Sequence, residues 1–122
     1  MFTLTTDNVE QIHDDLLGPH ELAGRARDKS LDAALARVEN RLAYGMIEDV
    51  YDLAAAYAMA IARGHCFNDG NKRTAFRSLH LCLLANGVNI SHLNDDIGDQ
   101  IIALAQGAID DGDLADWLRD RA

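Results

Sequence analysis

The sequence predicts an all-α protein of about six helices in one domain spanning residues 1–122. Apolar residues recur at helical spacing through most of the chain. Gly, Asn, Ser and Asp residues interrupt these runs where helices are expected to end or begin, and no repeat or linker divides the chain. With 122 residues, 48% of them hydrophobic, the chain is long enough for one compact core.

The first two helices are expected on either side of a polar loop. Asp7 is the expected N-cap of the first helix, with Glu10 as its capping-box partner. Gly18 and Pro19 end this helix, and residues 18–29 form the loop. Ser30 is expected to cap the second helix. The apolar faces of the two helices consist of Val9, Ile12, Leu16 and Leu17, and of Leu31, Leu35, Val38 and Leu42.

The third and fourth helices are expected to flank a polar loop that contains a glycine. The third spans about residues 47–62 and ends at Gly64. The fourth continues to Ala85, where Asn86 and Gly87 predict a left-handed C-cap. Because the fourth helix is apolar on several sides, we expect it to be central and buried. The inward residues of the third helix are Val50, Leu53, Ala54, Tyr57, Ala58 and Ile61.

The last third of the chain predicts two further helices. Residues 88–90 form at most a short extended piece, and a fifth helix is expected over residues 94–108. Gly112 is expected to separate it from a short last helix. The apolar positions of these helices are Ile97, Ile101, Leu104 and Ala108, followed by Leu114, Trp117 and Leu118.

Composition excludes several classes of protein. A net charge of −9 argues against a general nucleic-acid binder, because contacts to the phosphate backbone need a basic surface. Cys66 and Cys82 suggest reduced thiols rather than a disulfide framework. Neither a signal peptide nor a membrane-length apolar run is evident. We therefore expect a cytoplasmic protein with no direct nucleic-acid or membrane partner.

Residues 65–73 carry a base and an acid just before an expected helix start. Histidine is the residue type best suited to take the proton from an attacking hydroxyl near neutral pH, so His65 is a candidate base; alternatively it is a surface or capping histidine. Asp69 could hold Mg²⁺ together with phosphate oxygens, or it could simply cap the next helix.

The rest of this segment predicts an anion site. Gly70 allows a phosphate to approach the backbone, and the first N–H groups of a helix lack partners inside it. Asn71, Lys72 and Arg73 follow; the two cations oppose the helix dipole, and a bound polyphosphate would offset that cost. The alternative is that both cations turn into solvent, or that one of them pairs with an acid such as Asp69. Arg63 either reaches the same phosphates or is an ordinary cation at a helix C-terminus.

This segment resembles the signature of the Fic/Doc superfamily, histidine–x–phenylalanine–x–acid–glycine–asparagine–(glycine or lysine)–arginine. Lys72, in the place of the second glycine, is the mark of Doc, the death-on-curing toxins. The resemblance covers roughly residues 8–120. It also rests on four further segments, namely residues 37–44, residues 62–65, Thr74-Ala75, and the helix that ends in Asn86-Gly87-Val88.

The resemblance implies a small helical toxin with a cognate antitoxin, whose disordered C-terminal segment folds onto it. It implies ATP as phosphate donor, Mg²⁺ as metal and a hydroxyl of elongation factor Tu as acceptor, so that protein synthesis stops. The implied catalytic residues are His65 as base, Asp69 as metal ligand, and Lys72. The expected phosphate and nucleotide contacts are made by Arg63, Asn68, Gly70, Asn71, Arg73 and Arg77.

Two positions depart from the Doc pattern, and two other functions remain open. Gly70 replaces a usual alanine, and Arg77 replaces an asparagine that would contact phosphate. A Fic-type AMP transferase is the first alternative, and a non-catalytic binding module is the second. The nearest match to the internal inhibitory motif of Fic proteins runs from Thr6 to Glu10 but continues with Gln11, so we expect inhibition to be supplied in trans.

Overall fold

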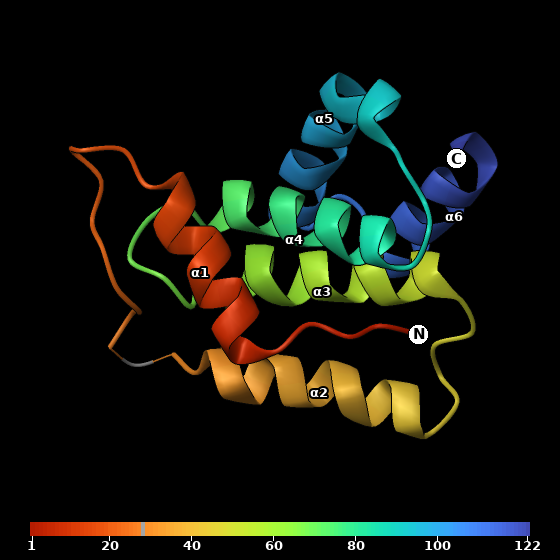
Figure 1. The fold of residues 1–122 in the computed structure, drawn as a ribbon, viewed down its shortest axis with the longest axis horizontal. Coiled ribbons are helices and arrows are strands. Elements are labelled where there is room, and N and C mark those ends of the chain that lie inside the picture. Colours follow the sequence, from red (N-terminus) through yellow and green to blue (C-terminus); the bar gives the residue numbers. More distant parts are fainter. Residues whose placement is uncertain (28) are drawn as a thin grey trace.

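The structure, a computed structural model, describes residues 1–27 and 29–122, and it confirms the all-α prediction (Figure 1). Asp28, in the expected loop, lies outside the described residues. In the described part of the chain the only β-type pairing is an isolated bridge between Arg25 and Phe67. The helices are α1 (Thr6–Leu16), α2 (Leu31–Ala43), α3 (Val50–Gly64), α4 (Asn71–Ala85), the 3₁₀ helix η1 (Ser91–Leu93), α5 (Asn94–Ala105) and α6 (Asp111–Arg121).

The centre of the fold is α3, not α4 as expected. Helix α3 contacts α2, α4, α5 and α6, and its six consecutive residues 53–58 are all buried. Four of these six are alanines, whose small side chains let neighbouring helices approach from every side. Helix α4 packs along α3 but leaves Arg77 and Leu84 exposed. The sequence-based expectation overestimated the burial of α4: α3 is the more hydrophobic helix per residue, and its alanines let the neighbouring helices pack closely.

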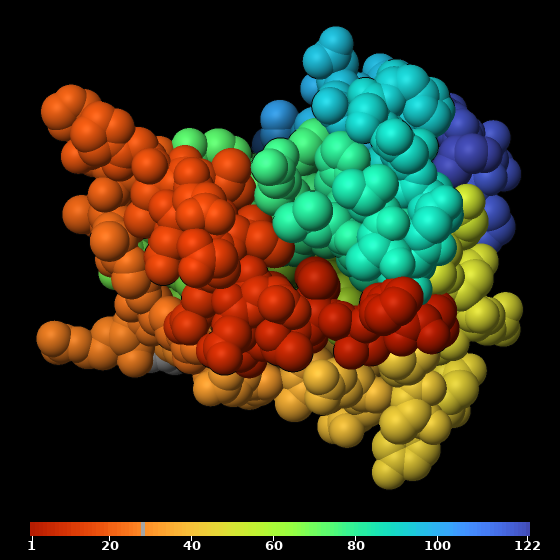
Figure 2. Space-filling model, viewed as in Figure 1, coloured from red at the N-terminus to blue at the C-terminus, as the bar shows by residue number. Residues whose placement is uncertain are grey.

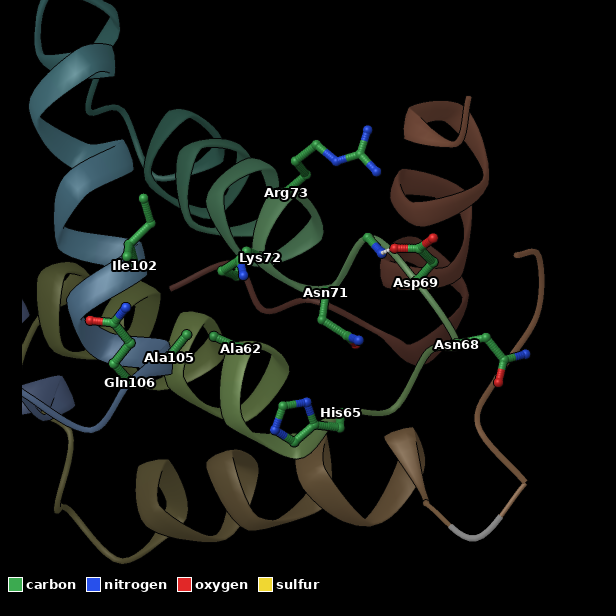
Figure 3. A pocket seen from close by; sticks show the side chains of 11 residues that line it. Ala62, His65, Asn68, Asp69, Asn71, Lys72, Arg73, Ile102, Ala105 and Gln106 are labelled. Atoms are coloured by element: carbon green, nitrogen blue, oxygen red, sulfur yellow. Dashed lines mark hydrogen bonds between the residues drawn. The ribbon is translucent and has the colours of Figure 1, made fainter. Parts of the chain in front are cut away.

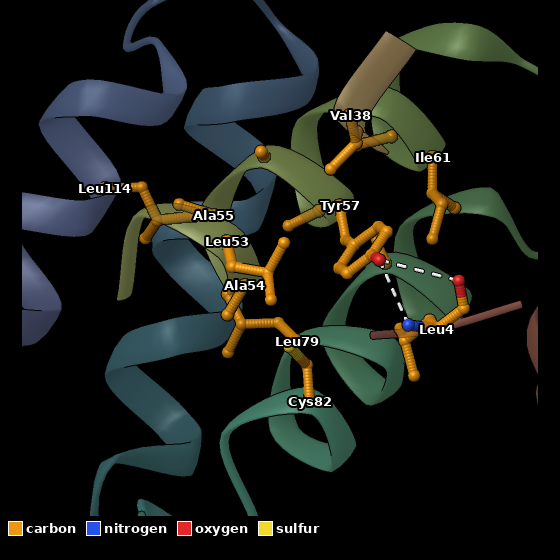
Figure 4. Close-up of a cluster of buried hydrophobic side chains, with 14 of the residues drawn as sticks. Leu4, Val38, Leu53, Ala54, Ala55, Tyr57, Ile61, Leu79, Cys82 and Leu114 are labelled. Atoms are coloured by element: carbon orange, nitrogen blue, oxygen red, sulfur yellow. Dashed lines mark hydrogen bonds between the residues drawn. The ribbon is translucent and has the colours of Figure 1, made fainter. Parts of the chain in front are cut away.

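The N-terminal segment crosses the surface between α2 and α4, and a buried tyrosine holds it there (Figure 2). The backbone N–H of Leu4 donates to the hydroxyl of Tyr57 at 3.0 Å, and that hydroxyl lies 3.4 Å from the Leu4 carbonyl (Figure 4). Burial raises the pKa of the Tyr57 phenol. This contact fixes the chain just before α1 begins, so it sets where α1 lies on the core.

The starts of α1 and α3 differ from expectation. Thr5, not Asp7, is the N-cap of α1, and its capping-box partner is Asn8. Asp49 accepts a hydrogen bond from the N–H of Asp52, so α3 begins at Val50 instead of about residue 47. Sequence spacing alone could not choose between neighbouring caps, because several polar residues precede each helix.

Two expectations for the C-terminal third were wrong as well. Gly107, with φ of 79°, ends α5 at Ala105, and Ala108 is exposed. Gly112 lies inside α6, which Asp110 caps. The left-handed turn at Gly87 after α4 is confirmed, with φ of 87°. Within the described residues, no helix combines the length and the hydropathy needed to cross a bilayer.

We predict that Tyr57→Phe lowers the free energy of unfolding by about 1–3 kcal/mol, because it leaves the buried N–H of Leu4 without a partner. Urea unfolding followed by circular dichroism measures the change. Tyr51→Phe is the matched control, since Tyr51 is only half-buried, and it should cost much less. Equal losses in the two variants would mean that the contact to Leu4 contributes little.

Candidate active site

A cavity of about 390 Å³ opens between the end of α3, the start of α4 and the face of α5 (Figure 3). This volume lies within the range of small-molecule sites. Seven of its lining residues come from the segment that the sequence singled out, and α5 closes the far side. The lining consists of Ala62, His65, Asn68, Asp69, Gly70, Asn71, Lys72, Arg73, Ile102, Ala105 and Gln106.

The loop between α3 and α4 is fixed from outside by the segment that follows α1. The N–H of Ala26 donates to the carbonyl of Cys66 at 2.8 Å, and the N–H of Asn68 donates to the carbonyl of Gly24 at 3.1 Å. These two bonds give the antiparallel bridge between Arg25 and Phe67. The expected loop after α1 therefore contains a short extended stretch that holds the active-site loop in place.

The same loop is also closed from within by Asn71. The side-chain oxygen of Asn71 accepts from the N–H of Phe67 at 3.1 Å, and its amide nitrogen donates to the Phe67 carbonyl at 3.0 Å. The Phe67 ring is 3% exposed, so the loop is anchored by burial as well. Both polar atoms of the Asn71 side chain thus hold the loop, which leaves the second N–H of its amide and its backbone N–H for the expected contact with phosphate.

The start of α4 is left open toward the cavity. Gly70 is the N-cap with φ of 75°, a conformation that glycine adopts without strain, and no side chain caps this helix. The N–H of Gly70 is taken by Asp69 Oδ1 at 2.9 Å. The N–H groups of Asn71, Lys72 and Arg73 have no partner among the described residues. Such free donors at the positive end of a helix dipole form an anion site.

His65 stands at the opposite wall of the cavity. It is the C-cap of α3 with φ of 50°, a left-handed conformation that is uncommon for a residue with a side chain. This turn directs the exposed imidazole into the cavity, toward α4 (Figure 3). In the part of the chain that the structure describes, no hydrogen bond occupies the ring nitrogens, so either could exchange a proton with a bound molecule.

The two cations of the segment differ in their surroundings. Lys72 is exposed at the cavity, whereas Arg73 points away from His65 (Figure 3). The Arg73 guanidinium pairs with Glu21 and lies 3.4 Å from the Leu16 carbonyl. The alternative in which one cation pairs with an acid is therefore confirmed for Arg73, and the acid is Glu21 rather than Asp69. An incoming phosphate would compete with Glu21 for this cation.

Two residues that were expected to contact phosphate, Arg63 and Arg77, do not line this cavity. Arg63 Nε donates to the Leu104 carbonyl at 2.9 Å, and Arg63 Nη2 donates to the Ile109 carbonyl. Arg63 therefore binds carbonyl groups at the C-terminal end of α5 and just beyond it. Arg77 lines a neighbouring groove instead. Asn68 does line the cavity, but its side chain donates to the Ala23 carbonyl at 3.0 Å.

That neighbouring groove, which we call the α1–α4–α5 groove, has a volume of about 380 Å³ and an apolar floor rimmed by cations. It shares Lys72, Arg73 and Ile102 with the cavity, so the two hollows adjoin each other. It is lined by Leu16, Lys72, Arg73, Phe76, Arg77, Gly98, Ile101 and Ile102.

Sequence reasoning missed the residues that come from elsewhere in the chain. Ile102 and Gln106 line the cavity only because α5 packs across α4, which spacing within one helix does not reveal. His13 contacts the loop from α1; its place on the apolar face beside Val9 and Ile12 was the available signal. Cys66 is no nucleophile for His65, because burial raises the pKa of its thiol.

Comparisons with known proteins agree with this geometry. The model of the Fic/DOC family matches residues 3–83. Protein kinase Doc of Escherichia phage P1 is 40% identical over 98 residues, which cover 80% of this chain and 77% of that protein. Toxin Doc of Mycolicibacterium smegmatis is 41% identical over 63 residues, covering 50% of this chain and 48% of that protein. The matched region contains α1 to α3, all but the end of α4, and the whole loop of the cavity, and this chain therefore belongs to the Fic/DOC family.

Proposed function

We propose that this protein is a toxin that transfers the γ-phosphate of ATP to a hydroxyl of a translation factor, with elongation factor Tu as the target. The observation that carries the proposal is the cavity itself: His65 faces free N–H groups at the start of α4, with Asp69 beside them. The similarity to a relative named as a protein kinase supports the choice of reaction. This protein would act in the cytoplasm, because translation takes place in that compartment.

The proposed step assigns one task to each element of the site. His65 takes the proton of the acceptor hydroxyl while the hydroxyl oxygen attacks the γ-phosphorus. The bond between that phosphorus and the bridging oxygen breaks, and ADP leaves with the electron pair. The N–H groups of Asn71, Lys72 and Arg73 hold phosphate oxygens, and the Lys72 ammonium adds a compact positive charge. Positioning and charge stabilisation are the main contributions in phosphoryl transfer.

Asp69 fits a magnesium ion that is shared with a nucleotide. Among the described residues no three His, Cys, Asp or Glu side chains gather into a site that could hold a metal by itself. Mg²⁺ is often held by one or two carboxylates together with phosphate oxygens and water, which one cavity-lining carboxylate can satisfy. When bound, the ion would neutralise charge on the phosphates.

Two alternatives remain distinct from this proposal. In an AMP transferase the α-phosphorus would lie near His65, and the target would gain a whole AMP group. In a non-catalytic module the target would gain no mass. The Lys72 side chain favours phosphate transfer, because it occupies space at the cavity where a glycine would leave the backbone open to the outer phosphates.

We predict that the wild-type protein, incubated with Mg²⁺, ATP and elongation factor Tu, adds one phosphoryl group to that factor. His65→Ala should slow this transfer about 10²–10⁴-fold, the usual loss for a general base. Intact-mass spectrometry gives both the rate and the identity of the added group. His92→Ala, at an exposed position on η1, is the control and should keep the wild-type rate. Undiminished transfer by His65→Ala would remove His65 from the mechanism.

We predict that Lys72→Gly shifts transfer from a phosphoryl group toward AMP. The glycine would open the backbone at the start of α4 to the β- and γ-phosphates and so bring the α-phosphorus toward His65. The same mass measurement reports the ratio of the two products. Lys29→Gly removes an equal charge outside the cavity and should leave the ratio unchanged. If Lys72→Gly adds phosphate alone, Lys72 does not set the orientation of the nucleotide.

We also propose a cognate antitoxin with a disordered C-terminal segment that folds into the α1–α4–α5 groove. The groove offers an apolar floor to an amphipathic helix, and its rim of Lys72, Arg73 and Arg77 favours an acidic one. Because Lys72 and Arg73 line both the groove and the adjoining cavity, a segment lying in the groove would cover the start of α4. The cost of ordering the segment would be offset by this burial.

We predict that Gly98→Glu weakens neutralisation by the antitoxin encoded beside this gene. Gly98 lines the groove but not the cavity, and a side chain there meets no atom within 4 Å. The added acid should lower affinity about tenfold by opposing an acidic segment. Gly98→Ala is the matched control and should remain neutralised. Calorimetric titration with the purified antitoxin measures the affinity of each variant. Equal affinity of Gly98→Glu and Gly98→Ala would mean that the antitoxin binds outside this groove.

A further inference from the structure

His13 is a buried polar residue that the proposed mechanism does not use. It lies on α1, is 1% exposed, and shares the inward face of that helix with Val9 and Ile12. An apolar side chain would be the ordinary occupant of such a position. The question is therefore what an imidazole supplies there.

The imidazole holds the backbone of the active-site loop. His13 Nε2 lies 2.7 Å from the carbonyl oxygen of Asp69. A carbonyl can only accept, so Nε2 must carry the proton of this bond. Asp69 O has no other donor among the described residues. With the Gly70 N–H bonded to Asp69 Oδ1, the peptide group between Asp69 and Gly70 is fixed at both ends.

The ring also packs against the loop on two sides. It stacks on Phe67 with centroids 3.8 Å apart and an angle of 8° between the planes. It also lies 3.7 Å from the place where a Cβ on Gly70 would stand. One side chain from α1 therefore contacts the anchor of the loop, its acid and the glycine before α4.

We propose that His13 is a positioning residue, which acts through Asp69 by fixing the peptide that sets the direction of its carboxylate. This inference rests on the proposed function, because it concerns the Mg²⁺-nucleotide that Asp69 would help to hold. Partners that orient a metal ligand commonly change metal affinity or activity about 10–100-fold when they are lost. His13 would thereby make α1 part of the active site without touching the substrate.

A purely structural role does not account for the choice of histidine. A phenylalanine could stack on Phe67 equally well. It would also avoid burying Nδ1, which has no hydrogen bond in the part of the chain that the structure describes. The closest acid oxygen, Asp14 Oδ1, is 3.5 Å away on an exposed side chain. The donor to Asp69 is what histidine adds, at the expense of an unsatisfied nitrogen.

The test compares two variants that separate the ring from the donor. His13→Phe keeps a stacked ring without a donor, and His13→Gln keeps an N–H at a similar reach without the ring. We expect His13→Phe to weaken ATP binding about tenfold or more in Mg²⁺ and little without it. His13→Gln should recover most of the affinity. Calorimetric titration with ATP, with and without Mg²⁺, measures this in variants whose circular dichroism matches the wild type.

A double-mutant cycle with Asp69→Asn shows whether His13 acts through Asp69. If it does, His13→Phe should have little further effect in the Asp69→Asn background. The inference would be overturned if the losses of ATP affinity in the two single variants multiplied in the double variant. It would also be overturned if His13→Phe bound ATP as tightly as the wild type, or if His13→Gln did not recover the affinity. ¹⁵N NMR of the wild-type imidazole should also find the proton on Nε2, and a proton on Nδ1 alone would overturn the inference regardless of binding. Absence of ATP binding by the wild type would instead count against the proposed function.

Discussion

The site depends on the hydrogen bonds that tie the backbone of the loop between α3 and α4 to other parts of the protein rather than to the cavity. The Cys66 carbonyl and the Asn68 N–H pair with the segment after α1, both backbone groups of Phe67 pair with Asn71, and the Asp69 carbonyl pairs with His13. Buried backbone groups need partners, and here they find them inside the protein. The first N–H groups of α4, in contrast, have no hydrogen-bond partner among the described residues. A rigid loop thus holds a set of unsatisfied donors opposite His65, which is the arrangement an anion needs.

Charge distribution follows from the same constraint. The protein carries a net charge of −9, yet Lys72, Arg73 and Arg77 gather at the start of α4, where cations oppose the helix dipole. Glu21 relieves Arg73, while Lys72 remains exposed at the cavity. A polyphosphate would satisfy the free N–H groups and the cations together. The cavity and the α1–α4–α5 groove share Lys72 and Arg73, so a ligand in one alters the field in the other.

The sequence predicted the fold class and the segment of the site, because both are local. Helical periodicity is visible within each element, and His65 to Arg73 are contiguous. What it could not predict depends on packing between distant elements. The contacts of Arg63 were not predicted, because the carbonyls of Leu104 and Ile109 come from a distant part of the chain. The contribution of His13 was missed because 56 positions separate it from Asp69. The centre of the fold was misjudged because the expectation rested on the apolar residues of α4 alone, although α3 is the more hydrophobic of the two helices and four others pack against it.

The central claim is that the free N–H groups at the start of α4 bind phosphates, with Asp69 holding the metal. Titration of ¹⁵N-labelled protein with ATP and Mg²⁺, followed by NMR, tests it directly. The account predicts that the amide signals of Gly70, Asn71, Lys72 and Arg73 move most, and that in Asp69→Asn the Mg²⁺ dependence of these shifts is lost. Shifts confined to another surface, such as the groove between α2 and α3 near Arg37, would contradict it.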